Sequence, residues 1–264
     1  PMVSFAVREY GCIAGINITA SHNPKEYNGY KVYWEDGAQL PPVHADEVAR
    51  KMKELDVFTC VKTADYDTAL AEGKIVLMGK ETDEAFLANV MQQVNDKAVV
   101  EKVADDFKMV YTPFHGCGHK LVPEALRELG VKHLHCVEEQ MVIDGNFPTV
   151  ESPNPEERTT MRMAIEQGQR EGAEIVMATD PDSDRIGIAV PDENGNFVLL
   201  NGNQTCVLLT YYMCRRWKEN GLLDGKQYIV KTIVTTELLR AIAGKYGVQV
   251  YNVLTGFKLS LIHI

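Results

Sequence analysis

FKMVYTPFHGCGHKLVPEALRELGVKHLHCV, residues 107–137, decides the fold class of this 264-residue chain. The apolar run at 107–111 predicts a strand, and the loop TPFHGCGHK separates it from an amphipathic stretch at 121–129 that predicts a helix. A second apolar run at 133–137 predicts another strand. A strand, a helix and a strand joined by short loops form a β-α-β unit, so we expect an α/β protein.

The same alternation continues on both sides of this unit. Further strands are predicted at 15–19, 29–34, 174–178, 227–234 and 248–253, and further helices at 43–55, 83–94, 155–169, 204–218 and 236–246. The polar stretch 59–74 is expected to be connecting surface, and a domain boundary is expected near 82–96. We therefore expect one layout three times along the chain, with mixed or parallel sheets and helices on both faces.

Composition limits the partners and the location of the protein. The net charge is 27 − 37 = −10, and the longest basic cluster is Arg215-Arg216, so nucleic acid is not an expected partner. No apolar run approaches the ~18 residues that span a bilayer, so no membrane partner is expected. Six scattered cysteines without a C-x-x-C pair favour reduced thiols and a cytoplasmic location. Nothing in the sequence indicates an oligomeric state.

The two ends predict a fragment. The chain begins at Pro1, without an initiator methionine, on what reads as a helix already under way. It closes on the apolar segment KLSLIHI, directly after a predicted strand and turn. The residues after Lys258 are candidates for a foreign C-terminal segment.

The segment ATDPDSDRIGIAV, residues 178–190, carries three alternating carboxylates between apolar runs. In an extended loop Asp180, Asp182 and Asp184 share one side and converge, which favours a hard divalent cation such as Mg²⁺, Mn²⁺ or Ca²⁺. An EF-hand is excluded, because its sixth and twelfth positions require Gly and Glu and are Arg and Pro here. A polar hairpin loop without a metal stays open as the alternative.

A second polar loop, TASHNP at residues 19–24, follows a predicted strand and presents Ser21 beside His22, with Lys31 ten residues on. Arg185 next to three acids suits a phosphate, whose oxygens bridge a metal and a guanidinium. A phosphorylated Ser21 would supply that phosphate. The plainer interpretations are a turn-forming serine and a histidine that hydrogen-bonds its own loop.

The loop TPFHGCGHK has two further features. Gly116-Cys117-Gly118 is not a phosphate-binding P-loop, because no G-K-[ST] follows it. His115 precedes a predicted helix, where it could bind an anion, but a structural role is favoured.

TASHNP, the following YNG and Lys31, and DPDSDR at 180–185 together resemble the α-D-phosphohexomutases, the family of phosphoglucomutase and phosphomannomutase. The resemblance implies repeated mixed-sheet α/β domains, with the first and third incomplete and the fourth absent. It implies the C-terminal part of domain I with the phosphoserine loop at 1–85, metal-binding domain II at 86–200, and the N-terminal part of sugar-binding domain III at 201–264.

The resemblance also implies roles for individual residues. The implied catalytic residues are Ser21, His22 and Lys31; the metal ligands are Ser21, Asp180, Asp182 and Asp184; the substrate-binding residues are Arg185, Lys231, Thr255 and Gly256. Ser21 would carry the phosphoryl group, Arg185 would steady it, and Lys31 and His22 would serve proton transfer. As a base, Lys31 would need neighbouring cations to lower its pKa.

The implied activity is a reversible conversion of hexose 1-phosphate, glucose 1-phosphate above all, and hexose 6-phosphate through a hexose 1,6-bisphosphate. Mg²⁺ and, as activator, glucose 1,6-bisphosphate would be required, and hexose phosphates would be the small-molecule partners. The alternatives are a phosphomannomutase, a phospho-amino-sugar mutase, a hydrolase, and a metal-binding fragment that is inactive by itself. The chain as given is expected to be weakly active or inactive, because most of the substrate clamp is missing.

Overall fold

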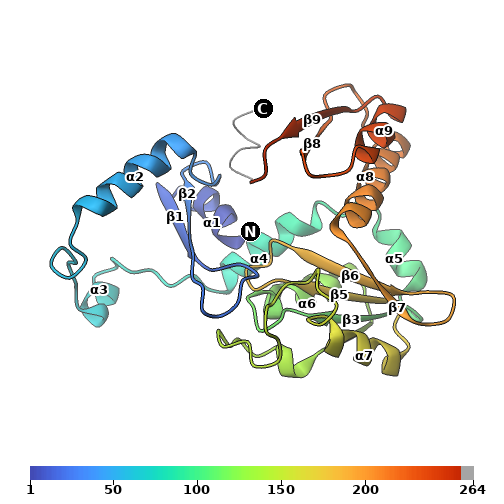
Figure 1. Cartoon of the computed structure of the whole chain (residues 1–264), viewed down its shortest axis with the longest axis horizontal. Coiled ribbons are helices and arrows are strands. Elements are labelled where there is room, and N and C mark those ends of the chain that lie inside the picture. Colours follow the sequence, from blue (N-terminus) through green and yellow to red (C-terminus); the bar gives the residue numbers. More distant parts are fainter. Residues whose placement is uncertain (257–264) are drawn as a thin grey trace.

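The computed structural model describes residues 1–256, and three sheet-containing units follow one another along the chain (Figure 1). The expectation about the residues after Lys258 lies outside the described residues. The first unit contains α1 (Met2–Glu9), β1 (Ala14–Ile18), β2 (Tyr30–Trp34), α2 (Pro42–Glu54), α3 (Tyr66–Ala71) and α4 (Lys80–Met91). Strands β1 and β2 are antiparallel, with Asn17 opposite Lys31, and the loop 19–29 connects them.

The second unit is built on a five-stranded mixed sheet of order β4-β3-β5-β6-β7. Its elements are α5 (Lys97–Val103), β3 (Lys108–Thr112), α6 (Gly118–Leu129), β4 (His133–Cys136), η1 (Glu138–Gln140), α7 (Arg162–Glu171), β5 (Ile175–Thr179), β6 (Ile186–Pro191) and β7 (Phe197–Leu200). Strand β3 is parallel to β4 and β5, whereas β6 and β7 are antiparallel to their neighbours. The expectation of a mixed sheet is confirmed.

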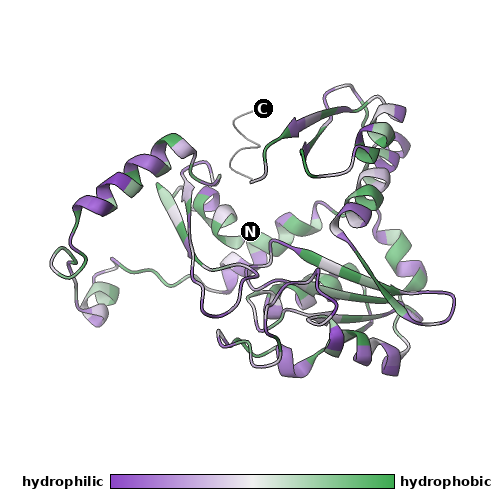
Figure 2. Ribbon diagram, viewed as in Figure 1, coloured by the Kyte–Doolittle hydropathy of each residue, from purple (hydrophilic) through white to green (hydrophobic). Residues whose placement is uncertain are grey.

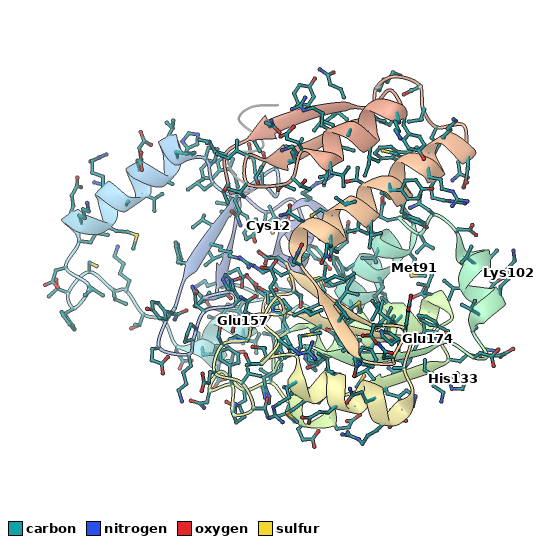
Figure 3. All side chains as sticks on the ribbon, turned by 45° about the vertical axis from the view of Figure 1, so that its right-hand side comes forward. Cys12, Met91, Lys102, His133, Glu157 and Glu174 are labelled. Atoms are coloured by element: carbon teal, nitrogen blue, oxygen red, sulfur yellow. The ribbon has the colours of Figure 1, made fainter. Side chains whose placement is uncertain are left out.

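The largest apolar core lies in this second unit. Val110, Phe114, Met161 and Val176 are among its fully buried members. Figure 2 shows the strands of this sheet as mainly hydrophobic and helix α2 as mainly hydrophilic. Figure 3 places Lys102 of α5 and the start of β4 at the outer edge of the same unit. The tight core gives the loops at the strand ends a rigid base.

The third unit contains α8 (Gly202–Glu219), β8 (Tyr228–Thr232), α9 (Leu238–Lys245) and β9 (Gln249–Val253). Strands β8 and β9 are parallel, and a small core that includes Cys214 and Ala243 joins α8 and α9 to them. Asn201 and Gln204 form a capping box that starts α8. No helix among residues 1–256 is long and apolar enough to cross a membrane.

The structure corrects the predictions at three helices. The helix predicted at 155–169 begins only at Arg162, because Arg158 donates to the Phe197 carbonyl at 2.9 Å and Thr160 donates to the Ser152 carbonyl at 2.8 Å. These bonds hold the preceding segment in turns. Two helices were not predicted, α3 within the stretch 59–74 and α5, and each begins with an aspartate side chain that accepts a backbone N–H.

Candidate active site

The loop between β1 and β2 holds Ser21 in a constrained backbone conformation. Ser21 has φ 56°, in the left-handed region that non-glycine residues rarely adopt, and its N–H donates to Thr19 Oγ1 at 2.9 Å. At the base of the loop the Thr19 N–H donates to the Gly29 carbonyl. A Cβ at position 29 would lie 2.1 Å from the Thr19 carbonyl oxygen, so only glycine permits this closure.

The acidic loop connects β5 to β6 and gathers its three carboxylates. One oxygen each of Asp180, Asp182 and Asp184 lie within 4.8 Å of one another. Asp180 is fully buried, and its Oδ1 accepts the backbone N–H groups of Asp184 at 3.1 Å and Arg185 at 3.0 Å. One carboxylate thus fixes the loop and forms part of the acidic cluster.

The two loops, from different units of the chain, meet at Ser21. Its Oγ donates to Asp180 Oδ2 at 2.8 Å across a separation of 159 residues, and His22 Nδ1 lies 3.3 Å from the same Oγ. Ser152 Oγ, also from the second unit, donates to the His22 carbonyl at 2.9 Å. Sequence reasoning missed Ser152, which acts on a backbone carbonyl and leaves no pattern in the sequence.

Lys31 lies on β2 and places its ammonium group among the acids. Lys31 Nζ lies 2.5 Å from Asp182 Oδ2 and 2.9 Å from Asp184 Oδ2. Burial acts to lower the pKa of Lys31, but the hydrogen bonds and charges of the two aspartates outweigh it and raise the pKa above its ordinary value. In this geometry Lys31 is a charged donor, and the neighbouring groups do not lower its pKa as a base would require.

The other ionisable groups of the site are also perturbed. Burial and the adjacent Asp182 raise the pKa of Asp180 to about 7. For Asp182, burial is outweighed by the hydrogen bond and charge of Lys31, which lower its pKa. Burial and the nearby charge of Arg185 lower the pKa of His22. The imidazole of His22 is therefore neutral at neutral pH and able to accept a proton.

The acidic loop fits a hard divalent cation. Three carboxylates that converge repel one another unless positive charge lies between them, and Lys31 supplies only one positive charge. Asp182 is 7 % exposed, and its buried Oδ1 has no hydrogen-bond partner among the described residues. A buried carboxylate oxygen without a donor is a ready ligand, and an all-oxygen set is the one that Mg²⁺ prefers.

The remaining residues predicted for substrate binding lie at different depths. Arg185 is exposed at the end of the acidic loop. Lys231 is 4 % exposed on β8, where its Nζ donates to the Thr235 carbonyl at 2.8 Å and pairs with Glu237 at 2.7 Å. Thr255 and Gly256 are exposed after β9. No hydrogen bond or ion pair among the described residues joins Lys231, Thr255 or Gly256 to Ser21 or the acidic loop.

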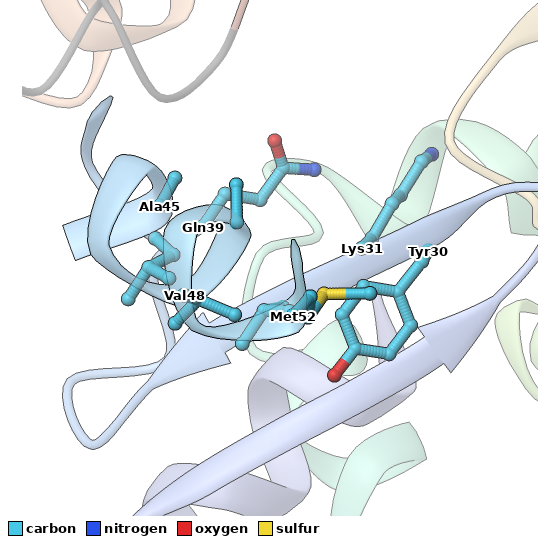
Figure 4. Close-up of a pocket in the computed structure, with 9 residues that line it drawn as sticks. Tyr30, Lys31, Gln39, Ala45, Val48 and Met52 are labelled. Atoms are coloured by element: carbon cyan, nitrogen blue, oxygen red, sulfur yellow. The ribbon is translucent and has the colours of Figure 1, made fainter. Parts of the chain in front are cut away.

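A cavity of about 640 Å³ opens at the junction of the two loops, and Ser21, Asp182, Lys25 and Cys117 are among its lining residues. A separate hollow of about 360 Å³ lies between β2 and α2, lined mostly by apolar side chains (Figure 4). Lys31 borders that hollow, but its amine reaches the aspartates of the acidic loop instead. The larger cavity is therefore the one next to the chemistry.

Fold and site together define a class: an α/β protein in which a serine of one unit faces an acidic loop of the next unit that could hold a metal ion. Models of one family match three successive segments of the chain, described as phosphoglucomutase/phosphomannomutase alpha/beta/alpha domain I at residues 1–57, domain II at 84–195 and domain III at 201–262. The chain belongs to the phosphoglucomutase/phosphomannomutase family.

Individual relatives agree with this assignment. The chain is 36% identical over 259 residues to a phosphoglucomutase of Staphylococcus saprophyticus and 36% identical over 265 residues to a glucose 1,6-bisphosphate synthase of Mus musculus. Both matches cover 98% of this chain, but only 45% and 42% of those proteins. A solved phosphomannomutase structure from Thermus thermophilus has the same fold, with a TM-score of 0.74, 23% identity, and coverage of 98% of this chain and 52% of that one.

Proposed function

We propose that this chain carries the phosphoryl donor and the metal site of a phosphohexomutase, which interconverts hexose 1-phosphate and hexose 6-phosphate through a hexose 1,6-bisphosphate. The observation that carries the proposal is the 2.8 Å hydrogen bond from Ser21 Oγ to Asp180 Oδ2. It brings a nucleophilic hydroxyl to a metal-binding acidic cluster that folds from a different part of the chain.

The groups at the site account for the bonds and the proton of a phosphoryl transfer from Ser21 to a sugar hydroxyl. The bond between phosphorus and Ser21 Oγ breaks, and a bond between phosphorus and a sugar hydroxyl oxygen forms. The hydroxyl proton moves to the neutral imidazole of His22 and from there to Ser21 Oγ, which lies 3.3 Å from His22 Nδ1. In the second half of the cycle the phosphoryl group at the other end of the hexose 1,6-bisphosphate returns to Ser21 Oγ: its bond to the sugar oxygen breaks, the bond to Ser21 Oγ forms, and the serine proton passes through His22 to the sugar oxygen.

The site residues divide the remaining tasks. Asp180, Asp182 and Asp184 would hold Mg²⁺, which supplies charge stabilisation for the phosphoryl oxygens when bound. Lys31 stays protonated and contributes a fixed positive charge next to the transferring group. Arg185, at the end of the acidic loop, adds a second positive charge.

Glucose 1-phosphate is the proposed substrate, with glucose 1,6-bisphosphate as the activator. Support comes from the phosphoglucomutase and glucose 1,6-bisphosphate synthase among the relatives, at equal identity to this chain. Lys231, Thr255 and Gly256 are proposed to contact the sugar phosphate when the third unit closes over the cavity. We place the protein in the cytoplasm, where hexose phosphates occur and where its cysteines would stay reduced.

Phosphorylation of the donor serine tests the proposal without requiring complete turnover. The chain is incubated with glucose 1,6-bisphosphate and Mg²⁺, and intact mass and peptide mapping locate any phosphate. One phosphate on Ser21, absent from the Ser21→Ala variant, is the expected result. An unmodified Ser21 peptide would remove the donor role.

A coupled assay separates the proposed activity from its alternatives. Glucose 6-phosphate formation from glucose 1-phosphate identifies a mutase, and release of inorganic phosphate identifies a hydrolase. Phosphorylation of Ser21 without either product identifies a chain that carries the phosphoryl donor but needs the additional domains of its longer relatives for turnover. Metal binding without phosphorylation identifies a metal-binding fragment.

A further inference from the structure

The segment Phe114–Gly118 lies against the acidic loop and has no part in the chemistry described above. Phe114 and His115 have φ 46° and 64°, two successive non-glycine residues in the left-handed region. Such backbone conformations cost energy, of the order of 1 kcal/mol each, and persist where the surroundings determine them. The segment is therefore held in an uncommon shape by its neighbours.

The neighbours that hold it come from the segment 140–149. The His115 N–H donates to the Gln140 carbonyl at 2.9 Å, and His115 Nδ1 donates to the Val142 carbonyl at 2.9 Å. The other ring nitrogen, Nε2, is hydrogen-bonded to the Thr149 hydroxyl 2.9 Å away. The Thr149 oxygen in turn accepts from Gln140 Nε2 at 2.9 Å. These bonds satisfy both ring nitrogens of His115, which agrees with the structural role favoured from the sequence.

Gly116 touches the backbone of the acidic loop. A Cβ at position 116 would lie 2.3 Å from Pro181 Cα, 2.7 Å from its carbonyl oxygen and 2.8 Å from its carbonyl carbon. All three are backbone atoms between Asp180 and Asp182, so no side-chain rotation relieves the overlap. The absence of a side chain lets the next residue, Cys117, donate its N–H to the Pro181 carbonyl at 2.8 Å.

Gly118 meets the other side of the same loop. A Cβ there would lie 2.4 Å from the Tyr111 hydroxyl and 2.8 Å from both the Ser183 and Thr179 hydroxyls. Tyr111 and Thr179 are hydrogen-bonded to each other at 2.8 Å, and Tyr111 is fully buried. Gly118 therefore packs against three hydroxyl groups. Two of them belong to residues next to the acidic triad: Thr179 directly precedes Asp180, and Ser183 directly follows Asp182.

We propose that Gly116 and Gly118 are positioning residues for the metal, because their bare backbone is the surface against which the acidic loop takes its shape. The proposal rests on the metal site in the proposed function. Mg²⁺ requires near-ideal octahedral geometry at short distances, whereas Ca²⁺ accepts longer and more irregular coordination. A displaced Pro181 shifts the aspartates that flank it, so Mg²⁺ affinity suffers more than Ca²⁺ affinity.

The experiment measures Mg²⁺ and Ca²⁺ dissociation constants by calorimetric titration of the full chain and of its Gly116→Ala and Gly118→Ala variants. The expected result is an Mg²⁺ constant about 10–100-fold higher in both variants, the usual effect of disturbing groups that orient metal ligands. The Ca²⁺ constant is expected to rise by a smaller factor. General loss of stability would not change the ratio of the two constants in the folded protein.

Two further variants complete the design. Gly244→Ala in α9 adds a methyl group where no heavy atom lies within 4 Å outside its own helix, and it should leave both constants unchanged. Gly118→Ala combined with Tyr111→Phe removes the oxygen at 2.4 Å, and it should recover part of the lost Mg²⁺ affinity. Circular dichroism establishes that each variant is folded before titration.

Each outcome decides. Unchanged Mg²⁺ affinity in both glycine variants, or an equal loss for Mg²⁺ and Ca²⁺, overturns the positioning role. Failure of every variant at positions 116 and 118 to fold assigns the glycines to folding and overturns it as well. An unmodified chain that binds no Mg²⁺ overturns both this proposal and the metal site, whereas phosphate mapping at Ser21 tests the donor role separately.

Discussion

Lys31→Met should increase the affinity of the acidic loop for Mg²⁺. Lys31 Nζ lies 2.5 Å from Asp182 Oδ2 and 2.9 Å from Asp184 Oδ2, so its positive charge repels a divalent cation that binds among the same carboxylates. The side chain of Lys31 is 24% exposed and that of Asp182 is 6% exposed. An exposed ion pair contributes up to about 1 kcal/mol, whereas breaking a buried one costs about 3–5 kcal/mol, and this pair lies between the two.

We take the free energy of the Lys31 ion pair near the lower end of this range. A gain of about 1.4 kcal/mol in Mg²⁺ binding corresponds to about a tenfold lower Mg²⁺ dissociation constant. Calorimetric titration of the metal-free chain and of Lys31→Met measures this difference. Methionine keeps the length and apolar stem of lysine and removes only the charge. Phosphorylation of Ser21 by glucose 1,6-bisphosphate should nevertheless slow, because the fixed positive charge next to the transferring phosphoryl group is lost.

Lys25→Met is the matched control for this prediction. Lys25 lies in the loop before β2 and lines the cavity next to Ser21, but it forms no ion pair with the acidic loop among the described residues. Removing its charge should change Mg²⁺ affinity far less. Unchanged or weaker Mg²⁺ binding by Lys31→Met would show that the charge of Lys31 does not oppose the metal, and would refute this prediction.

Three other predictions follow from the site. Asp182→Asn should raise the Mg²⁺ dissociation constant by about tenfold, since it removes one of three converging charges; equal affinities in a titration would favour a polar hairpin loop. Ser152→Ala should slow phosphorylation of Ser21 while leaving Mg²⁺ affinity unchanged, because Ser152 holds only the His22 carbonyl; unchanged phosphorylation rates would contradict it. The raised pKa of Asp180 stabilises the metal-free chain fully below its unfolded value of 3.8, and this contribution is lost as pH rises through about 7. Mg²⁺ needs the carboxylate, so the rise in Tm that Mg²⁺ causes should grow between pH 5 and pH 8, and a pH-independent rise would refute the assignment.

The sequence predicted the parts of the fold that depend on local periodicity. The apolar runs of β3 and β5 predicted strands correctly because these strands are buried in the sheet, whereas β4 lies at its edge and is only half-buried. The short helices α3 and α5 were missed, although Asp65 and Asp96 cap them, because neither has a buried stripe long enough to show a period. The start of α7 was misplaced because tertiary bonds of Arg158 and Thr160 hold the preceding turns.

The site divides in a similar way. The meeting of Ser21 with the acidic loop was predictable, because three converging carboxylates favour a cation and the adjacent Arg185 suits a phosphate that Ser21 could carry. The pairing of Lys31 with Asp182 and Asp184 was not, because it depends on the register that places Lys31 opposite Asn17 on a neighbouring strand. The role of Gly116 and Gly118 was not predictable either. A side chain at these positions would overlap with the acidic loop and its neighbours, and this becomes visible only when the position of that loop is known.

The donor hydroxyl and its acidic partner belong to separate sheets, and this has a consequence for the protein during its synthesis. Ser21 precedes Asp180 by 159 residues, so the serine is synthesised before its acidic partner exists. The reactive centre comes into existence only when the second sheet is complete and docked. Under the proposed function, a nascent or misassembled chain would therefore neither accept nor lose a phosphoryl group at Ser21.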